Sequence, residues 1–129
     1  MTTEQIFLYA LIALIAFYII RKVLLIRSIK HYSAQEASQK IKKERNVVFL
    51  DVRTVNERKK SLIKGSYHIP ITSIATNESE LKKFKEAEII CYCQTGSRSL
   101  NAAAKLKKLG FNAANLRGGI LRWNAAGLK

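Results

Sequence analysis

The sequence is poor in the side chains from which redox and metal sites are built, since its 129 residues include two cysteines and two histidines. Cys91 and Cys93 are separated by one residue, which is not the C-x-x-C spacing of a dithiol redox pair. With only His31 and His68 besides, no second ligand pair completes a zinc site. A structural disulfide is not expected in the cytosolic setting argued below. We therefore expect neither a metal nor a disulfide.

Acidic residues are also scarce: 9 Asp and Glu stand against 23 Lys and Arg, which gives a formal net charge of +14. Such a balance is typical either of nucleic-acid binding or of a basic surface that faces anionic lipid headgroups. The lysines are scattered through "KIKKER", "ERKK", "LKKFK" and "KLKK", without interleaved aromatic residues or a nucleic-acid-binding motif. We therefore expect no nucleic-acid partner and favour the lipid-facing alternative.

The leader "MTTEQ" lacks a basic side chain, and the unbroken apolar run Ile6–Ile20 follows it. A cleaved signal peptide has basic residues before its apolar run and small residues after it, whereas "RKVLLIRSIK" follows this one. A buried core helix would here be apolar on every face. The run is slightly short of the ~20 residues that a bilayer prefers, but interfacial residues at both ends can extend it. We expect a transmembrane helix over about residues 4–22 and a juxtamembrane linker up to residue 32.

The charges beside this span predict its orientation. Arg21, Lys22, Arg27 and Lys30 follow it, whereas Glu4 is the only charged side chain before it. Basic residues next to a span tend to stay on the cytoplasmic side. We expect a single-pass membrane protein with its C-terminal domain in the cytoplasm. The span either recruits a membrane-protein partner or only confines the domain, and the sequence leaves both open.

Residues 33–129 alternate between helical and strand patterns. Ser33 begins a helical segment, and Glu36 three residues later completes a capping box. Strand-like apolar runs occur in "NVVFLDV", "AEIICYC" and "FNAANL", and further helical segments in "NESELKKFKE", "SRSLNAAAKLKKLG" and "ILRWNAAG". This alternation predicts an α/β domain whose parallel sheet is flanked by helices on both faces. Sites in such sheets form beyond the carboxyl ends of the strands.

The loop "CQTGSR" begins where one of these strands ends, and it places Cys93 and Arg98 in C-x4-R spacing. Gly96 lets the backbone curl, so that successive N–H groups and the start of the next helix point toward the thiol. A positive environment of this kind favours the thiolate, which is the nucleophilic form of cysteine. Cys91 lies inside the apolar strand, and we interpret it as a small buried core residue.

The segment "CQTGSRSLNAAAKLKKLGF" resembles the active-site segment of single-domain rhodanese-type sulfurtransferases. "FLDVRTVNE" is similar to the D-V-R motif of that family, "IKGSYHIP" to its G-H-I-x-G-A-x-x-I-P element, and "LRGGILRWNAAGL" to its closing G-G-x-x-x-W segment. Ser61 and Leu62 stand where the family often has Gly-His, and Ser66 where it often has alanine. The resemblance covers about residues 33–129 and implies a rhodanese-like domain over that range.

The resemblance also implies a function. A rhodanese-type sulfurtransferase moves a sulfane sulfur from a small anionic donor, such as thiosulfate, to a thiol or protein acceptor. Cys93 is then the nucleophile and carries the sulfur as a persulfide, without a metal or organic cofactor. The persulfide-binding loop consists of the residues that follow it, namely Gln94, Thr95, Gly96, Ser97, Arg98 and Ser99.

Supporting roles are expected for charged residues near this loop. Arg98 either contacts the anionic donor or ties the loop to the scaffold through a carboxylate, for which Asp51 at the end of the neighbouring strand is the candidate. Arg53 is expected to guide anions into the site. Glu57 is expected to cap a helix or form an ion pair, and Trp123 to lie in the core.

Two other functions fit parts of the pattern. A cysteine phosphatase or arsenate reductase on the same scaffold has one more loop residue, C-x5-R, to enclose a tetrahedral oxyanion. The C-x4-R spacing here argues against both. A membrane-tethered, non-catalytic docking module stays open as an alternative, because an intact Cys93 loop does not by itself establish turnover.

Overall fold

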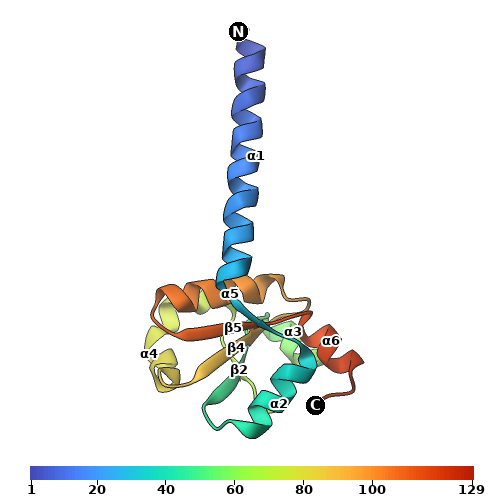
Figure 1. Cartoon of the computed structure of the whole chain (residues 1–129). Coiled ribbons are helices and arrows are strands. Elements are labelled where there is room, and N and C mark those ends of the chain that lie inside the picture. The colour runs from blue at the N-terminus through green and yellow to red at the C-terminus, as the bar shows by residue number, and fades with distance from the viewer.

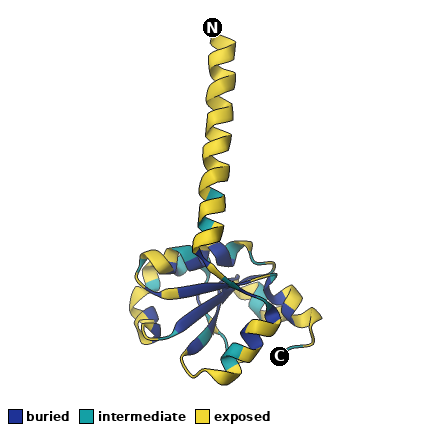
Figure 2. Cartoon of the chain, in the orientation of Figure 1, coloured by how far each residue is buried: buried dark blue, intermediate teal, exposed yellow.

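The N-terminal apolar run forms one long helix, α1 (Thr3–Ser28), in a computed structural model that describes residues 1–129 (Figure 1). Thr2 begins the helix with a capping box to Gln5, and none of its residues is buried (Figure 2). It is the one helix whose length and composition suffice to cross a membrane, with a mean hydropathy of 2.2. The helix continues past the expected end near residue 22 as far as Ser28.

The other residues build a five-stranded sheet, and every strand pair in it is parallel. The strand order is β1-β5-β4-β2-β3, with β1 at Lys30–Tyr32, β2 at Val47–Asp51, β3 at Tyr67–His68, β4 at Glu88–Tyr92 and β5 at Asn112–Leu116. The three inner strands, β5, β4 and β2, are flanked on both sides, and each has at least four of its five residues buried. The expected parallel α/β sheet is therefore confirmed.

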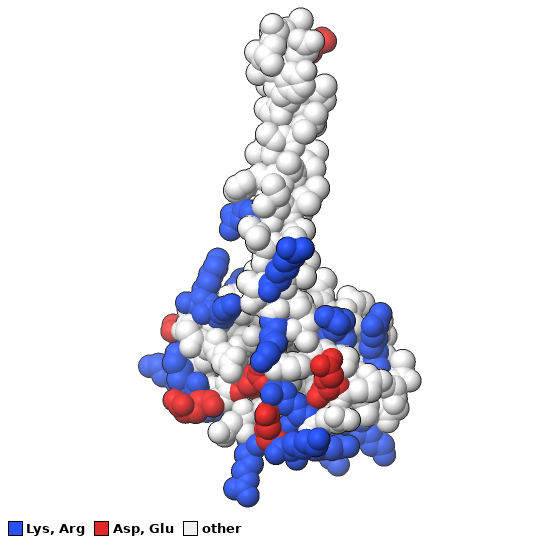
Figure 3. Space-filling model, in the orientation of Figure 1, with Lys and Arg blue, Asp and Glu red and all other residues white.

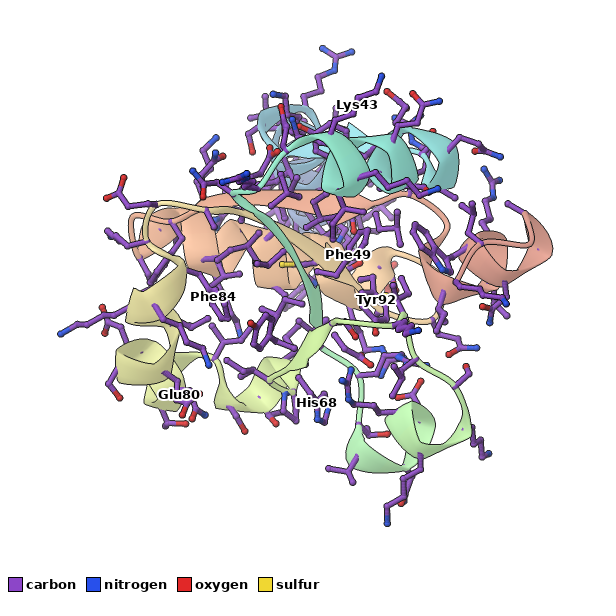
Figure 4. All side chains as sticks on the ribbon, turned by 90° about the horizontal axis from the view of Figure 1, so that it is seen from below. Lys43, Phe49, His68, Glu80, Phe84 and Tyr92 are labelled. Atoms are coloured by element: carbon purple, nitrogen blue, oxygen red, sulfur yellow. The ribbon has the colours of Figure 1, made fainter.

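Helices cover both faces of this sheet. The helices are α2 (Ala34–Lys43), α3 (Val55–Lys60), α4 (Glu78–Leu81), α5 (Ser97–Lys108) and α6 (Gly119–Ala125). One core cluster joins α4 and α5 to the sheet, and a second joins α2 and α6 to its other face. In Figure 4, Lys43 of α2 and Glu80 of α4 accordingly lie on opposite sides of the domain.

Successive residues of β4 enter these two clusters in turn. Ile89 and Cys91 belong to the cluster under α5, whereas Ile90 and Tyr92 belong to the one under α2 and α6. This alternation is the ordinary consequence of strand geometry. Cys91 is completely buried, so its interpretation as a core residue is confirmed. Trp123 is confirmed in the core as well, where its ring packs edge-on against Phe49 at 5.2 Å.

The starts of the helices follow from local capping and loop geometry. The capping box of Ser33 and Glu36 at α2 is confirmed, and Thr54 and Glu57 form a second one at α3. Helix α5 begins directly after Gly96, whose φ of 109° only glycine adopts readily.

Residues 30–32, which we expected to be linker, form the edge strand β1 instead. Lys30 pairs with Ala114 and Tyr32 with Leu116 of β5. The preceding Ile29 is buried, and Leu25 of α1 packs against the same core cluster. A three-residue strand has no recognisable periodicity, and this one is stabilised by pairing with a strand far along the chain. The sheet therefore begins at Lys30, directly after the long helix.

We predict that a fragment starting at Ser28 is more stable than one starting at Ser33. The shorter fragment loses β1 and the buried side chains of Ile29 and Tyr32, including the bond from the Tyr32 hydroxyl to Glu88 at 2.9 Å. Burial of two such side chains accounts for about 3 kcal/mol. Urea unfolding followed by circular dichroism should show a lower midpoint for the Ser33 fragment. Equal midpoints would mean that the edge strand contributes nothing.

Candidate active site

The loop that follows β4 lies at the carboxyl edge of the sheet, between the strand end at Tyr92 and the start of α5 at Ser97. Cys93 is the first residue of this loop, and its side chain is almost fully buried. Gly96 packs so closely against the Gly118–Gly119 turn that a Cβ there would lie 3.2 Å from the Gly118 nitrogen. The curled strand–loop–helix arrangement expected for this segment is therefore present.

The Cys93 sulfur is surrounded by hydrogen-bond donors. The backbone N–H of Gly96 donates to Sγ at 3.0 Å, and the Ser99 hydroxyl lies 3.4 Å from it. Burial opposes ionisation of this thiol, but hydrogen bonds from Ser99, Gly96 and Thr95 outweigh burial and lower its pKa. Burial raises the pKa of Cys91, which has no such donors. Two thiols separated by one residue are thus placed in opposite electrostatic environments.

Arg98 does not pair with Asp51, and that expectation is wrong. Its two terminal nitrogens donate to the two carboxylate oxygens of Glu57, each at 2.7 Å. The hydrogen bond from Arg98 lowers the pKa of Glu57 to about 2, with burial opposing it. Glu57 also caps α3 through Thr54, so both roles expected for it are confirmed. The pair ties the first turn of α5 to α3.

Asp51 instead holds Arg53, and both side chains are buried. Arg53 donates to the carboxylate through Nε at 2.9 Å and through Nη2 at 2.8 Å, and its backbone N–H donates a third bond. Arg58 and the Tyr92 hydroxyl also reach the carboxylate, at 3.2 and 3.1 Å. Burial raises the pKa of Asp51, but these bonds, from Arg53 above all, lower it on balance.

The expectation that Arg53 guides anions into the site is therefore wrong, because its side chain is 1% exposed. Its remaining contacts reach two loops. Nη2 donates to the Ser61 carbonyl at 2.6 Å, and Nη1 donates to the Gln94 side chain at 3.3 Å. Arg53 thus connects the end of β2 to the residue that follows Cys93.

The Gly118–Gly119 turn supports the loop from the opposite side. The Ile120 N–H donates to the Cys93 carbonyl at 3.0 Å, and the Leu121 N–H donates to the Gln94 carbonyl at 3.2 Å. A Cβ at Gly119 would lie 2.6 Å from the Cys93 carbonyl oxygen, so only glycine fits this contact. The resemblance includes the "GG" of this segment, but nothing in the sequence indicates that the turn packs on the cysteine backbone.

The hydroxyl residues of the loop divide into two groups. Thr95 and Ser97 are exposed, whereas Ser99 is buried. The Ser99 hydroxyl lies 2.5 Å from Oδ1 of Asn115 on β5, and Nδ2 of Asn115 lies 3.2 Å from Nδ1 of His31. Asn115 and His31 were not candidates from the sequence, because a lone amide and a lone histidine carry no motif. They adjoin the site only because β1 pairs with β5 beside β4.

The fold and this loop together define the class of protein: an α/β domain with one low-pKa cysteine in a strand–loop–helix turn. Residues 33–126 match the family model described as Rhodanese-like domain. The chain therefore belongs to the rhodanese family, and it is a rhodanese-family sulfurtransferase. The matched range leaves α1 outside the family domain.

Named relatives support this assignment. A sulfurtransferase of Allochromatium vinosum is 31% identical over 101 residues, which are 78% of this chain and 92% of the relative. A rhodanese-related protein of Thermoplasma volcanium superposes with a TM-score of 0.70 at 28% identity, over 78% of this chain and 95% of that one. A rhodanese-like domain protein of Staphylococcus aureus has the same TM-score, 0.70, at 28% identity and covers 78% and 97%.

We predict that alkylation of the native protein modifies Cys93 and spares Cys91. The pKa of Cys93 is lowered and that of Cys91 is raised, so Cys93 forms the thiolate at a lower pH than Cys91 does. The rate at Cys93 should rise with pH to a midpoint below the ~8.5 of a free cysteine. Iodoacetamide labelling with peptide mapping across that pH range measures the midpoint. In urea both thiols should react alike, and preferential native labelling of Cys91 would contradict the assignment.

Proposed function

We propose that Cys93 accepts a sulfane sulfur from a small anionic donor such as thiosulfate and passes it to a thiol on a small molecule or a protein. The observation that carries the proposal is the buried Cys93 sulfur with N–H and O–H donors directed at it and a lowered pKa. Such donors stabilise a thiolate, and equally the negative terminal sulfur of a persulfide.

The reaction proceeds as two displacements. The Cys93 thiolate attacks the outer sulfur of thiosulfate, a new S–S bond forms, and sulfite leaves with the electron pair of the broken S–S bond. An acceptor thiolate then attacks the outer sulfur of the persulfide, becomes a persulfide itself and releases the Cys93 thiolate. Covalent catalysis of this kind divides one transfer into two simpler steps.

The loop residues have different roles in this proposal. Gly96 supplies curvature and one N–H donor to the sulfur. The exposed hydroxyls of Thr95 and Ser97 lie where a donor would arrive and can hydrogen-bond its oxygens. Arg98 braces the loop through Glu57 and leaves a positive field near the thiolate. Gln94 is held by Arg53.

Intact mass spectrometry tests the proposal on the full chain in detergent. Incubation with thiosulfate should add the mass of one sulfur atom, and a reductant or a thiol acceptor should remove it. Peptide mapping should place the added sulfur on Cys93. If thiosulfate and a low-molecular-weight persulfide donor both leave the mass unchanged, the protein does not form the intermediate, and the docking-module alternative is favoured.

We further propose that α1 spans a membrane and that the domain faces the cytoplasm. Support comes from the length of α1, the absence of buried residues in it and the basic residues at its domain end, Arg21, Lys22 and Arg27. The expected partners are then the bilayer itself, a small sulfur donor and a thiol or protein acceptor.

We predict the topology to be N-terminus out, and an impermeant thiol label tests it in intact cells. Thr3→Cys at the start of α1 should be labelled from outside, whereas Lys43→Cys on α2 should be labelled only after permeabilisation. Both positions are exposed, so the two variants are matched. Both are made in a Cys93→Ser background so that the reactive natural thiol is not labelled, and Cys91 is completely buried. Labelling of Lys43→Cys in intact cells would reverse the orientation.

A further inference from the structure

A groove of about 1050 Å³ lies in the corner where α1 meets α5. Leu14, Phe17 and Leu24 form part of its apolar α1 wall. Its basic residues are Arg21 and Lys22 from α1 and Lys105 and Lys108 from α5, and no acidic residue lines it. The space-filling view shows the contrast between the white upper helix and the blue residues around its base (Figure 3).

The junction between α1 and the domain is packed, so it fixes which face of the domain lies next to the helix. Leu25 packs against the core and Ile29 is buried. Lys107 on α5 donates to the Ser28 carbonyl at 2.9 Å, and His31 bonds to the Ile26 carbonyl at 2.8 Å. Helix α5 therefore runs crosswise under the end of α1 (Figure 1).

Exposed apolar side chains lie between the basic pair Arg21–Lys22 and the domain, and they indicate how close the bilayer lies to α5. Val23, Leu24 and Ile26 are 42%, 60% and 41% exposed, although they lie nearer to the domain than Arg21 and Lys22. A helix from Ile6 to Ile26 is about 31 Å long at ~1.5 Å per residue, which matches a hydrocarbon core of ~30 Å. The headgroup layer then lies at the level of α5, and the long basic side chains reach it by snorkelling.

We propose that this groove binds an anionic phospholipid, with an acyl chain along α1 and the headgroup phosphate among Arg21, Lys22, Lys105 and Lys108. The inference rests on the membrane span proposed above. Four cations without an acidic neighbour complement a phosphate, and the apolar wall that continues into the span suits a lipid rather than a free anion. Helix α5 contains no Asp or Glu along its whole length, so nothing on it repels the headgroups.

The test reconstitutes the full chain in nanodiscs that contain equal amounts of phosphatidylglycerol and phosphatidylcholine, followed by mild extraction and native mass spectrometry of the retained lipids. Wild type should retain phosphatidylglycerol in preference to phosphatidylcholine. The double variant Lys105→Gln and Lys108→Gln should lower that preference by roughly thirtyfold, the expectation for two basic residues at about 1 kcal/mol each near a charged lipid surface. The matched control is Lys42→Gln with Lys43→Gln at the far end of α2, the same change in charge away from the groove.

Two outcomes overturn the proposal: equal retention of both lipids by wild type, or equal losses in the groove variant and the α2 control. The second result would indicate attraction by net charge alone. A separate experiment tests the span: the chain is placed in bilayers of phosphatidylcholine only, and alkaline extraction should not remove it. A chain that leaves such bilayers contradicts the span, whereas a chain that stays but shows no lipid preference contradicts only the groove.

A second inference concerns the single proton of the Ser99 hydroxyl. This oxygen lies 2.5 Å from Asn115 Oδ1 and 3.4 Å from Cys93 Sγ, and a hydroxyl has one hydrogen to donate. The His31 ring orients Asn115, because Nε2 donates to the Ile26 carbonyl and leaves Nδ1 to accept from Asn115 Nδ2. We infer that Asn115 competes with the Cys93 thiolate for the Ser99 proton and so acts as a positioning residue.

Variants of the two competitors should shift the pH midpoint of Cys93 alkylation in opposite directions. Asn115→Leu removes the competing acceptor at similar volume, so Ser99 can donate to the thiolate and the midpoint falls. Ser99→Ala removes the donor and raises the midpoint. Each shift should be about half to one pH unit, the equivalent of one hydrogen bond.

His31→Leu, on the half-buried edge strand β1, is the third variant of this experiment. It tests the inference even if Asn115→Leu fails to fold. Without the ring, the Asn115 amide can turn over and donate to the Ser99 oxygen, which again frees the Ser99 proton and lowers the midpoint. Circular dichroism confirms that each variant is folded. If the midpoint of Cys93 alkylation shifted in the same direction in Ser99→Ala and in the other variants, the inference would be overturned. A general loosening of the core would shift the midpoints of all variants in one direction.

Discussion

We expect sulfur transfer to disappear when Cys93 is replaced by serine, with a loss of at least about 10³-fold in the proposed thiosulfate:cyanide activity. A hydroxyl cannot form the persulfide, and no other thiol lies in the loop. The substitution changes one atom in a side chain that the surrounding loop holds through backbone contacts, so the fold should persist. Loss of activity together with an unchanged unfolding midpoint identifies a chemical role rather than a structural one.

Cys91→Ala is the matched control, because Cys91 is the other buried thiol and lies one residue before Tyr92 on β4. The Cys91→Ala substitution should lower the free energy of unfolding by about 1 kcal/mol, as for a small core change. It should leave the sulfur-transfer activity within a few-fold of wild type. If Cys91→Ala lost the persulfide while Cys93→Ala kept it, the nucleophile would be misassigned. Phosphatase activity, assayed in parallel, should be absent from every variant.

The sequence predicted the sheet, its helices and the reactive cysteine because each of these has a local pattern. The apolar runs around Phe49 and Ile90 have the composition of strands buried on both faces, and the structure buries them so. The loop at Cys93 combines a strand end, a glycine and a helix start within a few residues. Side-chain burial, capping and loop curvature all depend on neighbours close in the chain, which the sequence displays directly.

Pairings between distant residues could not be predicted in the same way. Asp51 and Glu57 are both carboxylates near the loop, and the sequence does not say which arginine each one binds. The structure pairs Arg53 with Asp51 and Arg98 with Glu57, because a residue two positions after the strand end can turn back to the carboxylate at that end. Arg53 is buried for the same reason, although an arginine in a loop is usually solvated.

The edge strand β1 is the clearest case of a feature that only tertiary structure defines. Lys30–Tyr32 contains a lysine and a histidine and follows a long helix without a break in composition. It becomes a strand because β5 presents an unpaired edge at the right distance from the end of α1. The same pairing brings His31 next to Asn115, and so joins the base of α1 to the residues around the thiol.

Asp51→Ala should cause a large loss of stability. Its carboxylate accepts bonds from Arg53, Arg58 and Tyr92 and is completely buried, as is the Arg53 guanidinium. Removing one partner leaves a buried charge without its counterion, which costs about 3–5 kcal/mol. Urea unfolding measures the difference. Glu44→Ala is the control, because it breaks an exposed pair with Lys40 worth at most about 1 kcal/mol.

The pH dependence of Asp51→Asn separates the ion pair from simple packing. The folded-state pKa of Asp51 lies below its usual value, so the carboxylate contributes stability that is fully present above the unfolded pKa of about 3.9 and is lost as pH falls through the folded value. The amide introduced by the substitution cannot titrate, so the difference in free energy of unfolding between wild type and Asp51→Asn should be constant near neutral pH and should shrink below about pH 4. A difference that stays constant into acid would mean that Asp51 acts by shape alone, and that the Arg53 charge is compensated by the Ser61 carbonyl and Gln94 instead.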